Sequence, residues 1–583
     1  MKKLLISGSR WRTILLFVFF FLTLLFKCAF FDYLITGNYV FGSIIKAPLY
    51  FLLYYSSAIF VSLFIASFVF LSKRRWWTVV VSLLIDIALL SNVLYFRANG
   101  LLINGYTMLI SNNLSGFGGS IKAYLKWEDA IPFLLTVALL ALCLCYRKKD
   151  KDNVNVTGWL VGLIMSLCFF AVKPIHTMKW NDWNKKVAFQ MFSYECLRDY
   201  KHYITYYNPL TYCVMVGGQT VSLLSHSAED WRDVMDEQDV MAIETRMNPA
   251  SGFDKICTDT VPRHLYLLFV ESFESWTISE TYTPNLVRFM EQHHDNLFYA
   301  DKVRSETMRG TSMDAQLIVN TGLLPTREAT VCNFYCNNCF YSLADVYAGF
   351  GAKTQMFVPH DRKIWNQDFM SEAFHFDSLA SFDHFGNDEE MFAKLSEFVN
   401  DKDNRFVHAI TISSHVPFEH EKEKYDLVLP DSIEYNDDIP LIVKNYLKAV
   451  HYMDSCLGAF LDGIDYENSV LAICGDHTWE SNMAGSYTEA ELALHKDENV
   501  YIPLIICSPS INGNRQIHES VYQMDIYPTL LNVLGMDGYC WKGFGVNLMD
   551  DEAVSNRMIS EEEAYQLSDK IIRTDYFKSL KTK

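Results

Sequence analysis

Thr311 is a hydroxyl residue whose surroundings suit nucleophilic chemistry. It lies in the sequence Arg-Gly-Thr-Ser at residues 309–312, ahead of an apolar, helix-compatible run that contains Leu317 and Ile318. The start of a helix offers unpaired N–H groups and the positive end of the helix dipole, which favour an oxyanion or a phosphate. Gly310 lets a substrate approach the backbone closely. On this short pattern alone, an ordinary helix N-cap is the more common role for such a threonine.

Further groups that could act with Thr311 follow three predicted strands. Glu271 follows the strand 265–270, Ser414 and His415 follow 406–412, and Asp476 and His477 follow 469–474. In a parallel sheet the site forms at the edge where the strands end. A carboxylate, an Asp-His pair and a hydroxyl at one edge can form a tetrahedral site for a divalent ion, which would lower the pKa of the nucleophile and neutralise a phosphate. Taken singly, Glu271 also fits an N-cap, Asp476 a turn and His415 the surface.

Strands and helices alternate in the region that would position these residues, from residue 263 onward. The other candidate strands are 354–358 and 501–507, and the candidate helices are 283–293, 441–461 and 527–534. This alternation predicts an α/β sandwich with a largely parallel sheet. We therefore predict an α/β catalytic domain over residues 263–583.

Apolar runs dominate the first third of the chain. The five runs are 13–31, 48–71, 79–96, 131–146 and 159–172. Most of them reach or approach the ~20 residues that a helix needs to span a bilayer. Basic clusters precede the first run, separate the second from the third, and separate the fourth from the fifth. The positive-inside rule then puts the amino terminus in the cytoplasm and everything after about residue 173 outside. We predict an α-helical, uncleaved domain of five transmembrane helices over residues 1–173.

Residues 174–262 form a predicted extracytoplasmic linker. Tyr and Trp are frequent in its first half, as at a membrane–water interface, and Asp and Glu are frequent in its second half. We expect this segment to pack on the domain that follows. The net charge of the whole chain is −18 although 50% of its residues are hydrophobic. This acidity excludes a general nucleic-acid binder and predicts an apolar part joined to an acidic, water-soluble part.

Three cysteines, Cys332, Cys336 and Cys339, are crowded into a polar stretch of the region predicted to lie outside the cytoplasm. Disulfides form in such compartments, so we expect these residues to be disulfide partners. A zinc knuckle is the alternative, but no fourth ligand is evident nearby.

The residues quoted above, with several others, resemble a known family. The phrases, in order, are Glu271-Ser-Phe-Glu-Ser275, Thr283-Pro-Asn285, Gly310-Thr-Ser312, Pro359-His360, Trp365-Asn366, Ser414-His415-Val-Pro417, Gly475-Asp-His477 and Asp525-Ile-Tyr-Pro-Thr529. They are similar in identity and order to the alkaline phosphatase/sulfatase superfamily. Within it they resemble the membrane-anchored lipoteichoic acid synthase and phosphoglycerol transferase branch. Five spans before an external domain also match, so the resemblance covers nearly the whole chain.

The resemblance implies a role for each matching residue. It implies that one divalent metal ion, with manganese favoured over magnesium or zinc, is held by Glu271, Thr311, Asp476 and His477. It implies that Thr311 is the nucleophile and His415 an acid or base. The residues expected to contact the transferred head group are His360, Arg362, Trp365, His415 and His495.

The implied reaction moves a phospholipid head group, with phosphoglycerol favoured, to an extracytoplasmic glycan or lipid. Thr311 would carry the head group after diacylglycerol leaves. The implied location is the bacterial inner (cytoplasmic) membrane, with the catalytic domain on the external or periplasmic side. The expected partners are a membrane phospholipid donor and an envelope glycan or lipid acceptor.

Two departures from the family pattern leave the head group open. The synthase branch has an arginine after Trp-Asn, whereas this chain has Gln367, for which Arg362 is a candidate substitute. His495 follows a leucine, as a histidine does in the phosphoethanolamine transferase branch, although an ordinary surface histidine is equally consistent. The alternatives are a phosphoethanolamine transferase and a membrane-tethered phosphodiesterase or sulfatase-type hydrolase. Thr311 lacks the Cys or Ser context that sulfatases use, and a silent membrane scaffold would not retain the whole set of site residues.

Overall fold

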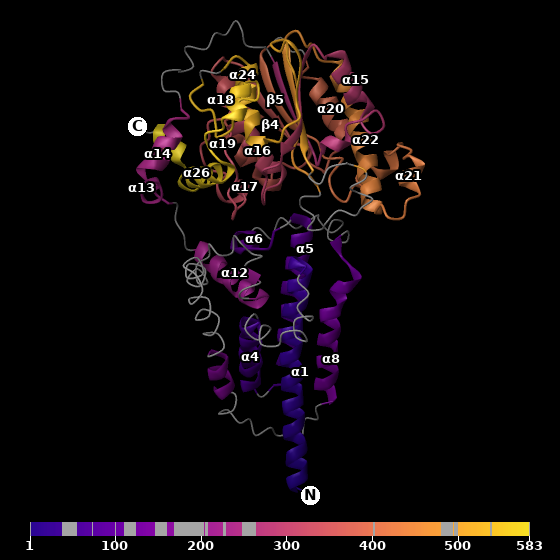
Figure 1. The fold of residues 1–583 in the computed structure, drawn as a ribbon, viewed down its shortest axis with the longest axis vertical. Coiled ribbons are helices and arrows are strands. Elements are labelled where there is room, and N and C mark those ends of the chain that lie inside the picture. Colours follow the sequence, from indigo (N-terminus) through magenta and orange to yellow (C-terminus); the bar gives the residue numbers. More distant parts are fainter. Residues whose placement is uncertain are drawn as a thin grey trace. The chain divides into compact units, whose positions relative to one another are not determined.

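The computed structural model describes residues 2–37, 55–72, 74–99, 101–109, 124–145, 160–167, 203–204, 208–224, 229–247, 264–399, 403–479, 494, 500–536 and 539–581. Contacts divide the chain into two compact units. The first comprises Met1–Ser111 with Ile121–His226, and the second comprises Asn112–Ser120 with Ser227–Lys583. Figure 1 labels the elements of both units.

The N-terminal unit is a set of apolar helices. Its elements are α1 (Lys2–Thr36), α4 (Ser56–Leu71), α5 (Trp77–Asn99), α6 (Gly105–Leu109), η2 (Trp127–Ala130), α8 (Ile131–Cys145) and α12 (Pro209–Leu223). Among the described residues, three stretches are long and apolar enough to cross a membrane, namely Trp11–Thr36, Trp77–Arg97 and Trp127–Cys145, and α4 is a shorter apolar helix. Residues 160–167, within the fifth predicted run, are also helical. The number of spans beyond these three stays a prediction.

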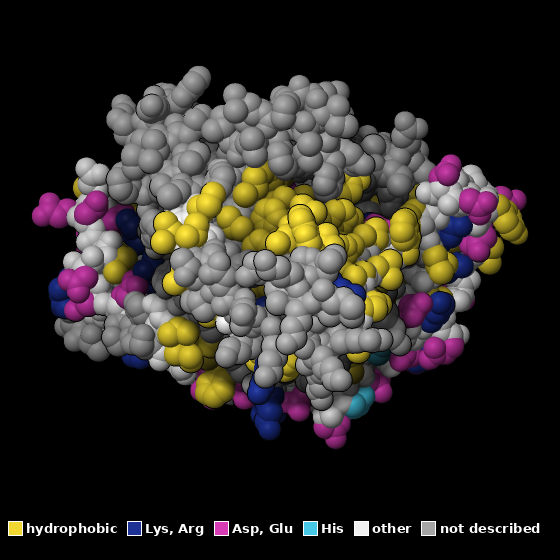
Figure 2. All heavy atoms as spheres, turned by 90° about the horizontal axis from the view of Figure 1, so that it is seen from below, with side chains coloured by type: hydrophobic (Ala, Val, Ile, Leu, Met, Phe, Trp, Pro, Cys, Tyr) yellow, Lys and Arg dark blue, Asp and Glu magenta, His cyan; other side chains and the backbone are white. Residues whose placement is uncertain are grey.

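The exposed side chains of these helices are largely apolar. Leu15, Leu84 and Leu134 are each more than half exposed, on α1, α5 and α8 respectively. Hydrophobic side chains also gather at the centre of the view in Figure 2. A water-soluble protein would bury such surface, so these helices are built for an apolar environment.

A buried ion pair joins three of these helices. The Lys27 ammonium on α1 contacts the Asp86 carboxylate on α5, and it donates to the hydroxyls of Ser82 at 2.7 Å and Thr136 at 2.8 Å. Thr136 lies on α8 and also donates to Asp86. Charges within a membrane segment are tolerated when they are paired and face other helices. This cluster therefore fixes how α1, α5 and α8 pack.

In the described part of the second unit, the helices pack on one sheet of nine strands. The strands are β1 (His264–Val270), β2 (Asn296–Arg304), β3 (Lys353–Phe357), β4 (Ser378–Ala380), β5 (Arg405–Ile410), β6 (Ser469–Gly475), β7 (Ile502–Cys507), β8 (Gly513–Ile517) and β9 (Val521–Tyr522). Their order is β4-β3-β5-β1-β6-β7-β2-β8, and β9 pairs with β2. The first five strands in this order are parallel, and β7 is antiparallel to both of its neighbours. The predicted α/β domain with a largely parallel sheet is thereby confirmed.

Helices cover both faces of this sheet. One layer contains α16 (Ser312–Thr321), α18 (Leu343–Ala348), α24 (Ile526–Val533) and α26 (Glu561–Thr574), and the other contains α15 (Pro284–Gln292), α20 (Asp388–Ser396) and α22 (Leu441–Asp462). The central strand β1 is fully buried, and its side chains alternate between the two cores: Leu265 and Leu267 face one layer, whereas Tyr266 and Leu268 face the other. The two-residue period of a strand thus fills both cores.

Shorter elements complete the second unit. They are α13 (Trp231–Val234), α14 (Glu237–Glu244), η6 (Ser275–Thr277), α17 (Val331–Phe334), η7 (Ile364–Asn366), α19 (Gln367–Ala373), η8 (Lys422–Lys424), α21 (Asp431–Glu434), η9 (Gln523–Asp525), α25 (Asp551–Ser555) and α27 (Tyr576–Lys581). Two helices from the predicted linker, α13 and α14, lie in this unit, and α12 lies in the first. Next to them, Lys570 and Arg573 on α26 form ion pairs with Asp239 and Glu229, each at 2.6 Å.

The crowded cysteines differ from the expectation. Among the described cysteines there is no disulfide, and this includes Cys332, Cys336 and Cys339. Cys332 is buried in the core on the α16 side of the sheet. The Cys339 thiol instead faces the His375 ring, with 3.5 Å between Sγ and Nε2. All three cysteines are free, so the predicted disulfides are wrong for this state of the protein.

Candidate active site

The sheet brings the predicted site residues together through its register. Val270, the last residue of β1, pairs with Gly475, the last residue of β6, so Glu271 and Asp476 leave adjacent parallel strands at the same edge. The Asp476 N–H donates to the Val270 carbonyl at 3.1 Å. A Cβ on Gly475 would lie 2.3 Å from the Phe273 carbonyl oxygen, so a residue without a side chain is required for this close approach.

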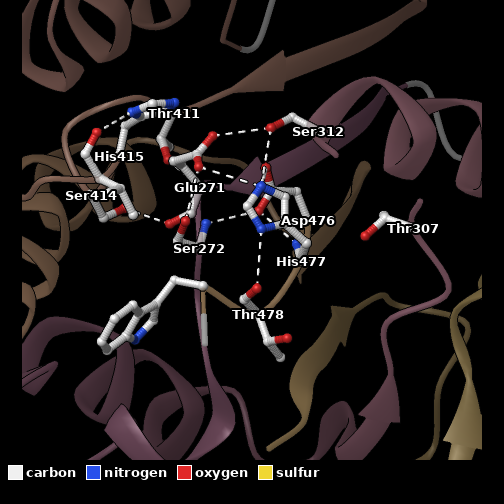
Figure 3. A network of polar contacts seen from close by, with 12 residues as sticks. Glu271, Ser272, Thr307, Ser312, Thr411, Ser414, His415, Asp476, His477 and Thr478 are labelled. Atoms are coloured by element: carbon white, nitrogen blue, oxygen red, sulfur yellow. Dashed lines mark hydrogen bonds and ion pairs between the residues drawn. The ribbon is translucent and has the colours of Figure 1, made fainter. Parts of the chain in front are cut away.

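A buried triad forms at this edge. One ligand atom from each of Glu271, Asp476 and His477 lies within 4.8 Å of the others. His477 Nε2 is 3.5 Å from Glu271 Oε1 and 3.5 Å from Asp476 Oδ2. Figure 3 shows the three side chains converging with Ser312. Within the described residues this is the one group of three or more acidic, histidine or cysteine side chains arranged to hold a metal ion.

A bound cation would stabilise the buried carboxylates of this triad. Burial, together with the neighbouring Glu271 carboxylate, raises the pKa of Asp476 to about 7. Burial lowers the pKa of His477, but the Asp476 and Glu271 carboxylates outweigh it and leave that pKa raised. Asp476 Oδ2 is buried and has no hydrogen-bond partner among the described residues. Two carboxylates and an imidazole are ligands of zinc and manganese, so this donor set fits a divalent ion.

The two hydroxyls of the Thr-Ser pair lie differently. Ser312, the first residue of α16, donates from Oγ to Glu271 Oε2 at 3.1 Å, and its Oγ is 3.4 Å from His477 Nε2. Thr311 occupies the N-cap position of α16, but its side chain makes no capping hydrogen bond. The N-cap role that the short pattern favours is therefore not the role of its hydroxyl. Of this pair, it is Ser312 whose hydroxyl contacts the triad; the Ser272 hydroxyl also donates to Glu271 Oε1, at 2.9 Å.

The backbone at Thr311 is strained. Its φ is 43° and its ψ is −113°, a conformation that residues with a side chain rarely adopt. Such strain persists only where surrounding contacts hold it, and it is concentrated at functional sites. A nucleophile on a sharp turn that leads into a helix is a recurring arrangement.

Asp314 holds this turn. Its Oδ2 accepts hydrogen bonds from the N–H groups of Met308 at 2.8 Å and Gly310 at 2.9 Å. A Cβ on Gly310 would lie 2.2 Å from Asp314 Oδ1, so glycine allows the carboxylate to fold back under the turn. Burial raises the pKa of Asp314 to about 7. Asp314 is not among the residues predicted from the sequence, although a short acidic side chain in the first turn of a helix is a common sign of a capping role.

The segment after β5 encloses the other side of Glu271. The Glu271 N–H donates to Thr411 Oγ1 at 2.9 Å, and the Ser414 hydroxyl donates to the Glu271 carbonyl. His415 follows, and its Nδ1 is 2.7 Å from the Val416 carbonyl oxygen. That contact fixes the orientation of the imidazole ring beside Glu271. Burial, reinforced by nearby His477, lowers the pKa of His415, so its ring is neutral at neutral pH.

Three of the predicted head-group residues, His360, Arg362 and Trp365, lie on the segment after β3, whereas His415 follows β5. His360 is buried, and its pKa is lowered by burial and by nearby His415. Trp365 has a left-handed φ of 54°. Arg362 is exposed and donates to Ser381 Oγ at 3.3 Å and to the Leu379 carbonyl at 3.4 Å. His495 lies outside the described residues.

Gln367 stands where the resemblance places an arginine. It is the first residue of α19 and is 1% exposed. Its Oε1 is buried with no hydrogen-bond partner among the described residues. A neutral amide at this position cannot supply the charge of a guanidinium, so the head-group subsite of this chain differs from the pattern.

Further positioning residues that sequence reasoning missed surround the triad. Gln523 donates from Nε2 to the Asp476 carbonyl at 2.8 Å. Glu274 accepts the Trp479 N–H at 3.1 Å and the Trp276 indole N–H at 2.7 Å. Gln523 lies two positions before Asp525, the first residue of the quoted Asp-Ile-Tyr-Pro-Thr phrase. Glu274 lies inside the quoted Glu-Ser-Phe-Glu-Ser phrase. No spacing in the sequence links Gln523 to Asp476 or Glu274 to Trp479, because these contacts join residues far apart in the chain.

Comparisons with known proteins agree with this architecture. Residues 1–218 match the family described as the lipoteichoic acid synthase N-terminal domain, and residues 327–536 match the sulfatase family. The lipoteichoic acid synthase of Staphylococcus saprophyticus is 20% identical over 531 residues, which cover 84% of this chain and 78% of that protein. The lipoteichoic acid synthase of Staphylococcus aureus is 21% identical over 525 residues, with 84% and 77% covered.

One solved structure is similar over almost the whole chain. It is the integral membrane lipooligosaccharide phosphoethanolamine transferase A of Neisseria meningitidis, with a TM-score of 0.50 and 16% sequence identity. The likeness covers 90% of this chain and 96% of that one, and it shows a shared fold.

These findings define a membrane protein with an extracytoplasmic sulfatase-type catalytic domain. The chain is lipoteichoic acid synthase-like, and it is a sulfatase-like transferase. The family resemblance read from the quoted phrases is thereby confirmed.

Proposed function

We propose that this protein is a metal-dependent transferase that moves phosphoglycerol from a membrane phospholipid to an extracytoplasmic glycan or lipid acceptor. The head group passes through a covalent intermediate on Thr311. The observation that carries the proposal is the buried Glu271, Asp476 and His477 triad beside the strained turn that ends in Thr311. The similarity to lipoteichoic acid synthases favours phosphoglycerol as the group transferred.

A divalent ion held by Glu271, Asp476 and His477, with Thr311 as a further ligand, would lower the pKa of the Thr311 hydroxyl and neutralise charge on the phosphoryl group. We favour manganese, with magnesium and zinc as the other candidates. Two observations support the need for this charge: Asp476 Oδ2 has no hydrogen-bond partner among the described residues, and the pKa of Asp476 is raised.

The first chemical step forms the intermediate. Thr311 Oγ attacks the phosphorus of the donor phosphodiester, the bond from phosphorus to the diacylglycerol oxygen breaks, and diacylglycerol leaves with a proton. The start of α16 offers its N–H groups to the phosphoryl oxygens. Ser312, hydrogen-bonded to Glu271, keeps that carboxylate in place during the step.

The second step transfers the head group. An acceptor hydroxyl gives its proton to His415 and attacks the phosphorus. The bond from phosphorus to Thr311 Oγ breaks, and Thr311 Oγ takes up a proton in place of the one that His415 received and then releases. The lowered pKa of His415 keeps its ring neutral and able to accept this proton. We propose that the head group contacts His360, Trp365 and His415. Arg362 and His495 are further candidates for this contact.

Phosphoethanolamine is the second candidate head group. Gln367 in place of an arginine favours it, because the feature that would grip phosphoglycerol is absent at that position. Transfer to water, which would make the protein a phosphodiesterase, is the third candidate reaction.

For the membrane part we propose five spans, with the amino terminus in the cytoplasm of a bacterial cell. The three long apolar helices, the shorter α4 and the helical residues 160–167 support this arrangement. The catalytic domain then faces the cell envelope, where an acceptor glycan or lipid is available.

The test is head-group transfer by the detergent-solubilised full-length protein. Phosphatidylglycerol or phosphatidylethanolamine is supplied with manganese, magnesium or zinc, and diacylglycerol release is followed together with the mass of the Thr311 peptide. We expect a phosphoglycerol adduct that is absent from a Thr311→Ala variant.

The outcomes separate the candidates. A phosphoethanolamine adduct would assign the protein to the second head group. Diacylglycerol release that yields free head-group phosphate in the presence of an acceptor would indicate hydrolysis. An adduct on another residue, or unchanged turnover in Thr311→Ala, would refute the proposed intermediate.

A further inference from the structure

A second chemically organised cluster lies in the catalytic unit, formed by Cys339, His375 and Asp345. The Cys339 thiol is 3.5 Å from His375 Nε2, and His375 Nδ1 is 2.7 Å from Asp345 Oδ1. None of the three residues contacts the Glu271, Asp476 and His477 triad, and none has a role in the transfer reaction proposed above. A thiol, an imidazole and a carboxylate in this order are the parts of an activated nucleophile.

Each member of the cluster is held in place by a further contact. Asp345 lies in the first turn of α18, and its other oxygen accepts the Ser342 N–H at 2.9 Å in a capping box. His375 has a left-handed φ of 61°, and its N–H donates to the Glu372 carbonyl at 2.9 Å. Both oxygens of the Asp345 carboxylate are therefore used, so the imidazole has a fixed orientation.

The cluster is open to solvent. The side chains of His375 and Asp345 are 32% and 19% exposed, and Cys339 is half-buried. A small molecule can thus reach the thiol, in contrast to Cys332, which is 1% exposed. The catalytic unit is extracytoplasmic, in a compartment where disulfides form and exchange.

The backbone around Cys339 argues against acyl transfer. An acyl-transfer site needs free N–H donors near the nucleophile to stabilise an oxyanion. Here the Cys339 N–H donates to Asp575 Oδ1 at 2.9 Å, and the next N–H, of Phe340, donates to the Ala373 carbonyl at 3.2 Å. Thiol–disulfide exchange needs no oxyanion hole, only a thiolate with access to its target.

We propose that Cys339 is a reactive thiol site whose substrates are the disulfides of small thiols. The Cys339 proton passes to His375 Nε2, and the thiolate attacks one sulfur of the disulfide. The S–S bond of the substrate breaks, a mixed disulfide forms at Cys339, and the departing thiolate takes the proton from the imidazolium. One disulfide is consumed and one is formed, so no other oxidant is needed.

The charged and titratable groups around the cluster set its pH dependence. They include Asp345 on α18, Asp575 at the end of α26, Tyr341 ahead of α18, Cys540, and the buried phenols of Tyr527 and Tyr539. Burial, with Cys540, Cys339 and Asp345 nearby, raises the pKa of Tyr341 to about 12, so this phenol is neutral at working pH. The His375 imidazolium is the cation that faces the thiol, and it favours the thiolate.

The test uses the reduced full-length protein and oxidised glutathione. The rate at which each cysteine peptide gains a glutathionyl group is measured by mass spectrometry between about pH 6 and pH 9. For an ordinary thiol this rate rises roughly tenfold per pH unit below a pKa of ~8.5. We expect the rate at Cys339 to become independent of pH at a pH at least one unit lower than for an ordinary thiol. Near neutral pH, Cys339 should be modified faster than the other cysteines.

Two variants and one control make the result specific. His375→Asn, chosen because asparagine tolerates a left-handed φ, and Asp345→Asn should each return Cys339 to the pH profile of an ordinary thiol. Cys336→Ser is the matched control, because Cys336 lies three residues away but its pKa is raised by burial. This control should leave the rate at Cys339 unchanged.

The proposal is overturned if Cys339 reacts no faster than Cys336 at neutral pH. It is also overturned if both the His375 and Asp345 variants, shown to be folded by circular dichroism, retain the wild-type profile. Since the readout is modification and not head-group transfer, a failed transfer assay leaves this test intact.

Discussion

Replacing Ser312 with alanine tests how the Thr-Ser pair divides its roles. The structure puts the Ser312 hydroxyl, not that of Thr311, in contact with the triad, at 3.1 Å from Glu271 Oε2 and 3.4 Å from His477 Nε2. If Thr311 is the nucleophile, Ser312 positions Glu271 and its loss leaves the chemistry possible. If Ser312 is the nucleophile, its loss abolishes transfer.

The size of the effect follows from these contacts. A hydrogen bond to a charged partner contributes about 1.5–3 kcal/mol. If that contribution is lost from the transition state, kcat/KM falls roughly 10–150-fold, since about 1.4 kcal/mol corresponds to a factor of ten. Removal of the nucleophile itself lowers turnover by more than about a thousandfold. The two roles thus differ by at least about sevenfold in the expected loss of activity.

The assay is diacylglycerol release from phosphatidylglycerol by Ser312→Ala, Thr311→Ala and the wild-type protein, at equal metal occupancy. We expect a partial loss in the first variant and complete loss in the second, with both variants folded, because the Thr311 hydroxyl makes no capping hydrogen bond. The opposite order, with Ser312→Ala inactive and Thr311→Ala close to wild type, would refute the assignment of the nucleophile.

Three further predictions concern the metal, the pH response and the turn. Asp476→Asn should weaken metal binding at least about tenfold, and full occupancy by elemental analysis would remove Asp476 from the ligand set. Burial raises the pKa of Asp388 to about 6, above its unfolded value of ~3.9. The charged form of Asp388 therefore lowers the free energy of unfolding by up to about 3 kcal/mol above pH 6, and this cost disappears below pH ~4. The melting temperature of Asp388→Asn should therefore rise relative to that of the wild-type protein as the pH increases from about 4 to 7. A difference in melting temperature that does not change with pH would contradict this. Gly310→Ala should displace the Asp314 side chain, because the new Cβ would lie 2.2 Å from Asp314 Oδ1. We expect a large fall in the rate of head-group transfer and a smaller change in the melting temperature. An unchanged transfer rate would show that the turn tolerates the shift.

The location of the triad was predictable because it depends on strand order in a simple way. Buried strands rich in branched apolar residues are visible as short runs, and parallel strands end at one edge. Glu271 and Asp476 each follow such a run, and the register of β1 with β6 makes them neighbours. The placement of His415 follows in the same way from β5, which pairs with β1 on its other side.

Contacts that depend on side-chain direction were not predictable. The thiols of Cys332 and Cys339 are seven residues apart, which fits a disulfide by spacing, but Cys332 faces the core and Cys339 faces His375. Spacing alone does not give the direction of a side chain in an irregular segment. The same limit explains why Gln523, 47 residues after Asp476, was missed as the donor to the Asp476 carbonyl.

The contrast between Thr311 and Ser312 shows how a local rule fails where function is placed. Capping preference predicts that a Thr at a helix start uses its hydroxyl on the helix. Here Asp314 satisfies the N–H groups of the turn, so the Thr311 hydroxyl is released from that role while the backbone keeps an unfavourable φ of 43°. A conformation that costs free energy and gains no hydrogen bond for its side chain persists because contacts elsewhere impose it. These contacts also fix where α16 begins and hold Thr311 beside the triad. Attack on a phosphodiester requires a nucleophile held in such a position.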